Sequence, residues 1–494
     1  MIRFTRAQVL PIGVDIGHDS VKMLQVEAVG TTLEVTAAAR MPLPPEAKAD
    51  PARRLPCAAD LIRQMLRLHP FRGRRIVAAL PRDIVTAKNL RLPPIPANEV
   101  AAVVKFEARN VFPFDVEQAR VHYLAAGEVR QGTELRQEVI VMAAPNDDVN
   151  AVVEHLHRSG AILESLDVEP CALYRSVERF IRRKEDENDV HVLVDVGARR
   201  SQVVIGRGHD ISFIKPIDIG GLHFHEAVAR KLGIPVDEAE ALRRRLVEAG
   251  DSADPAAARR DPVRQAVFDA TRAPMEELGR EISLCLRYYS VTFRGQRPTK
   301  LRLVGGEACD PQLQALLNAC LVIPVEVARP LYSVNISRMK PADRQGTMCE
   351  WALALGLSLR TTKDHYGARD GKPRDAAAVI VQTPSGTITP AAAAAQPAST
   401  AVVVDLATAL RQADAAALEH EAVTAADSAA ATATAVAKVI GVPAPAPANP
   451  SASLITALAN SEPASPTAPS TTPTETTATP TSSRKSTRKE RSRA

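Results

Sequence analysis

Aromatic residues are scarce in this chain: tryptophan, tyrosine and phenylalanine together make up 3% of its 494 residues. Apolar residues of all kinds reach 45%, which is enough material for two domains that each have a core. Leu, Val, Ile and Ala must therefore fill those cores. The formal net charge of +5 is small for this length, so the charge by itself does not indicate a nucleic-acid partner.

Cysteines are few, and the sequence has no CxxC pair and no cluster of histidines. This pattern excludes a disulfide framework and the usual zinc motifs, and it predicts reduced thiols that are mostly buried. The six cysteines are Cys57, Cys171, Cys285, Cys309, Cys320 and Cys349.

Long apolar runs are also missing. No uninterrupted stretch reaches the roughly 18–20 residues that crossing a bilayer requires, and Asp15 interrupts the first apolar run too early for a signal peptide. We therefore expect a cytoplasmic protein whose membrane association, if it has one, depends on a partner or on a surface contact.

A predicted β-hairpin, Ile12–Val26, contains the first candidate site. Its first strand ends in a carboxylate, Asp15, and a turn with Gly17 and Ser20 follows before a second strand with period-two alternation. A glycine turn lets backbone N–H groups approach phosphate oxygens closely, and a carboxylate beside it suits a hydrated metal ion. Alone, the pattern is common in ordinary hairpins.

A second copy of this pattern occurs at His191–Gly208, where Asp195 and Gly197 separate two apolar strands. The aspartates Asp15 and Asp195 are 180 positions apart, a distance that suits two duplicated domains facing each other across a cleft.

A third glycine turn, Gly305-Gly306, follows an apolar strand within Leu301–Leu313 and precedes a predicted helix. Three turns in this order resemble the phosphate-1, phosphate-2 and adenosine motifs of the actin-like ATPase superfamily. The resemblance implies a duplicated, RNase H-like α/β fold that binds ATP and Mg²⁺. Asp15 and Asp195 would face the Mg²⁺, directly or through water. The nucleotide would contact Asp15, Gly17, Ser20, Lys22, Asp195, Gly197, Arg200, Ser201, Gly305 and Gly306.

The passage Asn98–Asp115 makes the resemblance more specific. Its apolar residues repeat at helical spacing, Asn98 is the predicted N-cap, and Pro113 closes the helix. Spacing alone predicts an ordinary amphipathic helix. The letters KFEARNVFPFD, however, resemble a segment of the inserted 1C subdomain in the type IV pilus assembly protein PilM family, a relative of FtsA. The strand, helix and strand that follow, within residues 138–170, match that family in order.

Two further segments continue the resemblance. Lys231–Arg244 is similar to a segment that contacts nucleotide in actin relatives, which by position gives that role to Glu240 and Arg243. Trp351–Arg360 is similar to the second connecting helix that ends the fold. The expected organisation is domain 1 from residue 10 to 82, an inserted 1C-like module at 83–168, a connecting helix at 169–189, and domain 2 at 190–365 with an insertion at about 221–295.

The remaining residues, 366–494, are rich in Ala, Pro, Thr and Ser and end in a basic segment. This composition cannot bury enough apolar surface to offset the entropy cost of ordering, so we expect a disordered tail. The basic end suits contact with anionic lipid or nucleic acid at low salt, but a solvated tail is the preferred interpretation, because no aromatic residue lies among its charges for base stacking.

The chain departs from the family pattern in its turns. His18 and Asp19 precede Ser20 where the family carries serines, Arg199 and Arg200 replace threonines, and Glu307 replaces a small residue. Arginine can bind phosphate bidentately and so compensate for lost hydroxyls, or it can fill the cleft. We expect nucleotide binding with little or no hydrolysis, because the sequence marks no base that would activate water.

The resemblance implies a cytoplasmic actin-like scaffold on the inner-membrane platform of a type IV pilus. Its partners would be the cytoplasmic tail of a PilN-like bitopic membrane protein and other platform proteins. The tail would lie in a cleft near the strand Thr86–Leu92, Phe106 and Phe112, and ATP would act as a conformational ligand.

Alternatives from the same fold remain open. A cell-division actin of the FtsA kind would end in an amphipathic membrane helix, and the basic C-terminus here has no apolar face. The related type II secretion platform protein would continue into a transmembrane helix. A sugar or acetate kinase would need a catalytic base and a polar substrate pocket, and ADP production that rises with one added small molecule would identify it.

Overall fold

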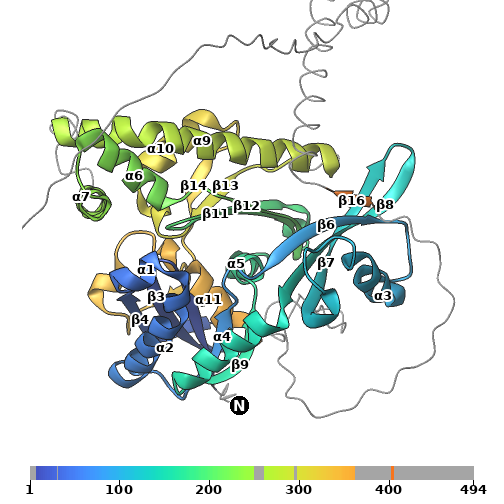
Figure 1. The fold of residues 1–494 in the computed structure, drawn as a ribbon, viewed down its shortest axis with the longest axis horizontal. Helices are drawn as coiled ribbons and strands as arrows, with labels where there is room; N and C mark the ends of the chain where they lie inside the picture. Colours follow the sequence, from blue (N-terminus) through green and yellow to red (C-terminus); the bar gives the residue numbers. More distant parts are fainter. Residues whose placement is uncertain (1–6, 31, 250–260, 294–296, 362–401, 405–494) are drawn as a thin grey trace, which may run out of the picture. The chain divides into compact units, whose positions relative to one another are not determined.

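In the computed structural model, the described residues are 7–30, 32–249, 261–293, 297–361 and 402–404. Two β-sheets of the same topology dominate this part of the chain, and a third, smaller sheet accompanies them (Figure 1). None of the described helices combines the length and the apolar composition that a bilayer span requires.

The first sheet has the strand order β15-β4-β3-β2-β5-β9, and β1 pairs with β3. The three strands β2, β3 and β4 form an antiparallel meander, which confirms the predicted hairpin, and β5 and β9 continue the sheet in parallel from β2. The strands are β1 (Gln8–Val9), β2 (Ile12–Ile16), β3 (Ser20–Val29), β4 (Thr32–Pro42), β5 (Arg75–Ala79), β9 (Ile162–Asp167) and β15 (Val334–Asn335).

Three helices bury apolar residues against one face of the first sheet. These are α1 (Pro45–Ala49), α2 (Pro51–Leu68) and α4 (Asn146–Arg158). Ile62 and Met65 of α2 and Leu156 of α4 are buried against Ile12 and Ile76 of the sheet. Apolar side chains at helical spacing on α2 thus face the alternating apolar residues of β2 and β5.

The second sheet, with the order β12-β11-β10-β13-β14, repeats the part β4-β3-β2-β5-β9 of the first and has no counterpart of β1 or β15 among the described residues. The meander consists of β10, β11 and β12, and β13 and β14 continue in parallel from β10, as β5 and β9 do from β2. This repetition confirms the predicted duplication. The strands are β10 (Val190–Val196), β11 (Ser201–Arg207), β12 (Asp210–Ile217), β13 (Leu301–Val304) and β14 (Val325–Val327).

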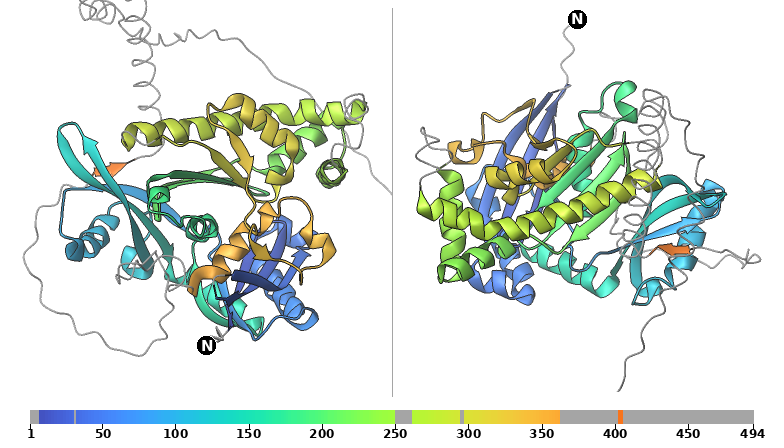
Figure 2. Two further views of the ribbon diagram at one scale, coloured as in Figure 1. Left: turned by 180° about the vertical axis from the view of Figure 1, so that it is seen from behind. Right: turned by 90° about the horizontal axis from the view of Figure 1, so that it is seen from above.

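Helices α6 (Gly221–Leu232), α9 (Pro262–Thr292) and α10 (Pro311–Cys320) cover the second sheet and share its core. The long helix α9, yellow-green in Figures 1 and 2, contributes Met275, Leu278 and Ile282 to that core. Helix α7 (Val236–Glu248) packs on α6 and α9 through a separate small cluster around Val228.

The third sheet has the order β16-β6-β8-β7 and carries helix α3 (Ala97–Ala108) on its own core. Its strands are β6 (Thr86–Leu92), β7 (Ala119–Gln131), β8 (Glu134–Pro145) and β16 (Val402–Val404). Helix α3 begins after Pro96, so Asn98 is not the N-cap that we predicted. Proline fixes an extended conformation at residue 96 and leaves Asn98 inside the first turn.

The inserted module is shorter than predicted. Residues 83–168 were expected to form it, but α4 packs on the first sheet and β9 pairs with β5, so the module proper ends near Pro145. Likewise, β15 pairs with β4, which places part of the expected domain 2 in the first sheet. Of the expected tail, Val402–Val404 form β16 on the edge of β6, and the rest lies outside the described residues.

Two short helices connect the sheets. Helix α5 (Glu169–Glu178) is the first, shorter than the predicted 169–189, and helix α11 (Ala352–Ser358) is the second. They cross at glycine: a Cβ added to Gly356 of α11 would lie 1.8 Å from the carbonyl oxygen of Ala172 in α5. On its other side, a Cβ added to Gly13 of β2 would lie 2.0 Å from the Ala354 oxygen of α11. Helix α11 is therefore held between β2 and α5 by backbone contact.

Candidate functional site

The two predicted phosphate turns have the same backbone geometry. Gly17 N–H donates to the Ser20 oxygen at 3.1 Å, and Gly197 N–H donates to the Arg200 oxygen at 3.1 Å. Each pair closes a tight turn directly after a strand that carries the predicted aspartate, Asp15 or Asp195. The duplication visible in the sequence therefore extends to the backbone hydrogen bond that closes each turn.

Each aspartate is almost buried and paired with a cation. Lys22 Nζ donates to Asp15 Oδ2 at 2.8 Å, across the hairpin from the neighbouring strand. Arg82, which follows the parallel strand β5, forms ion pairs with Asp195 and with Glu169. A Mg²⁺ ion at these carboxylates would have to share them with Lys22 and Arg82, or displace those side chains.

The third turn lies against the second. Gly305 has a φ of +95°, and a Cβ at this position would lie 2.4 Å from Asp195 Oδ1, so only glycine fits without displacement. At Gly306, by contrast, an added Cβ would meet no heavy atom within 4 Å. The structure thus brings Asp195 and Gly305, predicted from separate motifs, into direct proximity.

Arg243 and Glu240, the residues expected to contact nucleotide from α7, have different surroundings. Arg243 is 3% exposed and donates to Glu307 and Asp310, both at 3.0 Å. Burial opposes its charge, but the two carboxylates raise the pKa of Arg243 above its usual value. Glu240 accepts from Arg244 at 2.7 Å and lies 3.5 Å from Lys48. Both residues are therefore bound to other protein groups in this structure.

Asp19, one of the departures from the family pattern, has its negative charge compensated by neighbouring cations. It forms an ion pair with Lys48, and Arg244 and Arg40 lie 3.6 Å and 3.8 Å away. Burial opposes ionisation, yet these cations lower the pKa of Asp19. The residue is thus a carboxylate bound to cations, and it does not present an isolated negative charge to a phosphate.

Two other departures from the family pattern, Arg200 and His18, place a positive and a neutral side chain at the turns. Arg200 pairs with Asp83 at 3.1 Å and with Asp218 at 2.8 Å. Burial, with help from Arg54, lowers the pKa of His18 to about 4, so this imidazole is neutral at physiological pH. Ser201, in contrast, is fully buried and donates to the Ile219 oxygen at 2.6 Å, which gives it a structural role.

Arg54 of α2 is a site residue that sequence reasoning missed. Its side chain is 8% exposed, yet the Nε and Nη2 atoms have no hydrogen-bond partner among the described residues, and Nη1 lies 3.4 Å from Asp83. A buried guanidinium with two unpaired nitrogens beside His18 fits an anionic ligand such as a phosphate group. No motif marks this arginine, because only tertiary packing brings α2 to the first turn.

The residues expected to line a peptide cleft have mixed positions. Phe112 is buried in the core of the inserted module and Phe106 is exposed on α3, while Thr86–Leu92 is strand β6. Beside the start of β6, a small cavity lies where the module meets the first domain. Its lining includes Leu80, Val85, His122, Met142 and Val168. Phe112 is thus a core residue of the module, whereas Val85 lines the cavity.

Comparisons with known proteins agree with this architecture. Residues 13–362 match the family described as type IV pilus assembly protein PilM. A solved PilM–PilN type IV pilus biogenesis complex is similar at 26% identity, with 71% of this chain and 98% of that chain covered and a TM-score of 0.58. The ethanolamine utilization protein EutJ from Carboxydothermus hydrogenoformans follows at 14% identity, with 74% and 93% covered and a TM-score of 0.41. MreB5 of Spiroplasma citri bound to ADP matches at 10% identity, with 73% and 97% covered and a TM-score of 0.35.

The family match begins in strand β2, which precedes the first glycine turn, and ends just after helix α11. It therefore includes both duplicated sheets, the inserted module and all three glycine turns. With its actin-like fold, the chain belongs to the type IV pilus assembly protein PilM family.

Proposed function

We propose that this chain is an actin-like scaffold of the type IV pilus inner-membrane platform, which binds ATP with Mg²⁺ and the cytoplasmic tail of a PilN-like membrane protein. The observation that carries the proposal is the family match over residues 13–362, together with the likeness to a PilM–PilN complex over nearly the whole of that chain. The protein would associate with the inner membrane through this partner.

The three turns support the nucleotide part of the proposal. Asp15 and Asp195 would provide oxygen ligands for Mg²⁺, and the backbone N–H groups of the glycine turns would approach the phosphates. Arg54 offers two unpaired N–H-bearing nitrogens to the same anion. When bound, ATP with Mg²⁺ supplies negative charge that the cations of both domains can share, which favours a closed cleft.

We expect little or no hydrolysis. A general base must be free to accept a proton from water, and Asp15 and Asp195 are each bound to a cation. Nucleotide would then act on conformation and not as fuel.

A titration of the full chain with Mg²⁺ and ATP tests the nucleotide site. Asp195→Ala is expected to weaken binding about tenfold or more, since it removes one of the two carboxylates proposed to hold Mg²⁺. Asp60→Ala, at a 70% exposed side chain on α2, is the control and should bind normally. Unchanged affinity in Asp195→Ala would mean that this turn is not the phosphate site.

The small cavity at the start of β6 marks the place that we propose for the peptide. Leu80 and Val168 come from the first domain and Met142 from the module, with Arg120 and His122 beside them, so a peptide lying across the cavity would touch both domain and module. A peptide held in this way would fix the module relative to the domain.

Fluorescence anisotropy with a labelled peptide from the cytoplasmic tail of a PilN-like protein tests this step. Val85→Arg, which places a charge at the cavity, should weaken binding about tenfold or more. Leu135→Arg is the matched control, because Leu135 is already exposed at the start of β8. Equal affinity of both variants for the peptide would mean that the tail binds another surface of the protein.

A further inference from the structure

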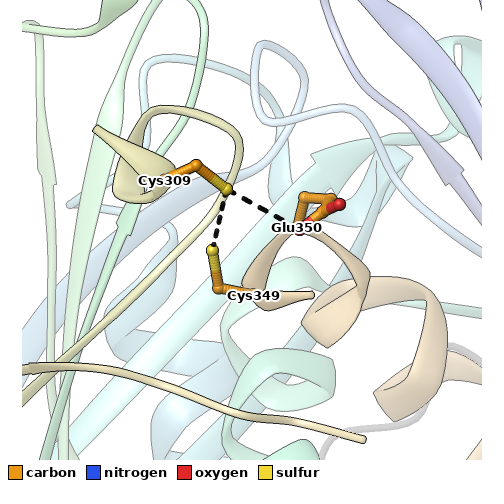
Figure 3. Close-up of side chains that lie close together, drawn as sticks. All are labelled: Cys309, Cys349 and Glu350. Atoms are coloured by element: carbon orange, nitrogen blue, oxygen red, sulfur yellow. Dashed lines mark hydrogen bonds between the residues drawn. The ribbon is translucent and has the colours of Figure 1, made fainter. Parts of the chain in front are cut away.

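Three side chains with metal-ligating atoms meet beside the third glycine turn. Cys309 ends the short helix η3 (Glu307–Cys309), and Cys349 and Glu350 lie in the short helix η5 (Cys349–Trp351) before α11. The two Sγ atoms are 3.4 Å apart, and Cys309 Sγ lies 3.8 Å from Glu350 Oε2 (Figure 3). The three ligand atoms all lie within 4.8 Å of one another.

These separations fit a single cation. Zinc binds thiolate sulfur at about 2.3 Å and carboxylate oxygen at about 2.0–2.2 Å in tetrahedral geometry, which places two sulfurs roughly 3.8 Å apart. The observed sulfur separation is within a few tenths of an ångström of that value. Cys309 is exposed while Cys349 is buried, so solvent reaches the site from the Cys309 side and the Cys349 side lies within the protein.

We propose that Cys309, Cys349 and Glu350 form a binding site for a thiophilic divalent cation such as Zn²⁺, with the fourth position open to water. This site is distinct from the Mg²⁺ position proposed at the phosphate turns, and it does not depend on the proposed function. Binding converts two thiols to thiolates and releases two protons, so the affinity increases with pH.

The chemistry of the cluster favours a cation over a disulfide. Glu350 Oε2 lies 3.8 Å from Cys309 Sγ, and its negative charge repels the thiolate that disulfide formation would require. For a cation, the same carboxylate is an additional ligand, and its negative charge and those of the two thiolates attract the cation.

A bound cation would join the third turn to the second connecting helix. Cys349 Sγ donates to the Gly305 oxygen at 3.4 Å, and Gly305 N–H donates to the Cys349 oxygen at 3.3 Å. Cation binding would remove the proton that Cys349 Sγ donates to the Gly305 oxygen, while the Gly305 N–H bond would remain and the cation would link η3 to η5. It would therefore hold the Gly305 turn in the conformation that this structure shows.

Cobalt titration of the untagged, fully reduced full-length protein tests the site. Co²⁺ occupies zinc sites, and thiolate ligands give it a charge-transfer absorption band whose intensity increases with the number of thiolates. We expect one equivalent of Co²⁺ to produce the band and one equivalent of Zn²⁺ to remove it. Cys309→Ser should lose about half the band intensity and bind at least tenfold more weakly. Because Cys309 is exposed, this variant is expected to fold.

Cys320→Ser is the matched control, since Cys320 is also exposed and ends the neighbouring helix α10. This variant should titrate like the wild type, and Glu350→Gln should keep the band with weaker affinity. The proposal is wrong if the wild type shows no band, if Cys309→Ser binds as the wild type does, or if Cys320→Ser loses binding. It is equally wrong if the reduced protein takes up no cation while mild oxidation joins Cys309 to Cys349, which would identify a redox pair.

Discussion

At the scale of single residues, Arg243 is a buried cation of the second domain. Two carboxylates and His225 surround its guanidinium. Arg243→Ala would leave Glu307 and Asp310 without their shared cation, so we expect a loss of about 3–5 kcal/mol in the free energy of unfolding. Chemical denaturation measures it, with Arg244→Ala as the control.

Arg244 is the neighbour of Arg243 in α7, but its side chain is 50% exposed. Its removal should cost at most about 1 kcal/mol, as for other exposed ion pairs. Similar losses in both variants would contradict the view that Glu307 and Asp310 depend on Arg243.

Buried neutral histidines predict a pH dependence of stability. Burial, followed by the effect of Arg243, lowers the pKa of His225 to about 4 in the folded protein. The unfolded chain binds this proton near its ordinary pKa of about 6.5, so protonation favours unfolding as the pH falls from about 6.5 to 4. Above pH 6.5 this effect is absent. Thermal unfolding at pH 7.5 and 5 should show a larger drop in Tm for the wild type than for His225→Gln.

At the scale of elements, the crossing of α5 and α11 depends on a glycine. Alanine is normally preferred over glycine in a helix by about 1 kcal/mol, so propensity alone predicts that Gly356→Ala stabilises the protein. The crossing predicts the opposite, because the new Cβ would overlap the Ala172 oxygen and force the helices apart. We expect a loss of about 1–3 kcal/mol.

Gly306→Ala is a suitable comparison for that measurement, since a Cβ there meets nothing within 4 Å. Its free energy of unfolding should stay close to that of the wild type. A Gly356→Ala protein as stable as the wild type would show that α5 and α11 can separate at little cost.

The sequence was sufficient to predict the elements that local pattern determines. Alternation and glycine placement located both hairpins that carry Asp15 and Asp195, and the strand before Gly305-Gly306 was also predicted correctly. Local pattern could not assign β9 to the first sheet or find β15, since both depend on pairings with distant strands.

The candidate site was predicted only in part for the same reason. Asp195 and Gly305 were identified by motif, and the structure brings them together. Arg54 and Arg82 were missed, because their role arises only where packing brings them near the turns. The meeting of Cys309 with Cys349, 40 positions apart, has no sequence signature of the CxxC type.

At the scale of the whole molecule, residues after 361 contribute only three described residues to the folded part, the strand β16. Deletion of residues 370–494 should therefore change the Tm by no more than about 2 °C. Differential scanning calorimetry of the shortened and full-length proteins measures the change. A large loss of Tm would mean that the tail packs on the core.

Strand β16 has a second consequence, for solubility. It pairs Val402–Val404 with Asn89–Arg91, so the outer edge of β6 meets a strand of its own chain. An open edge strand offers unpaired N–H and C=O groups on which a second molecule can add its own strand. In the full chain, β16 already pairs with this stretch of β6. These residues are therefore not available to pair with a strand of another copy of the protein, which limits aggregation at this edge.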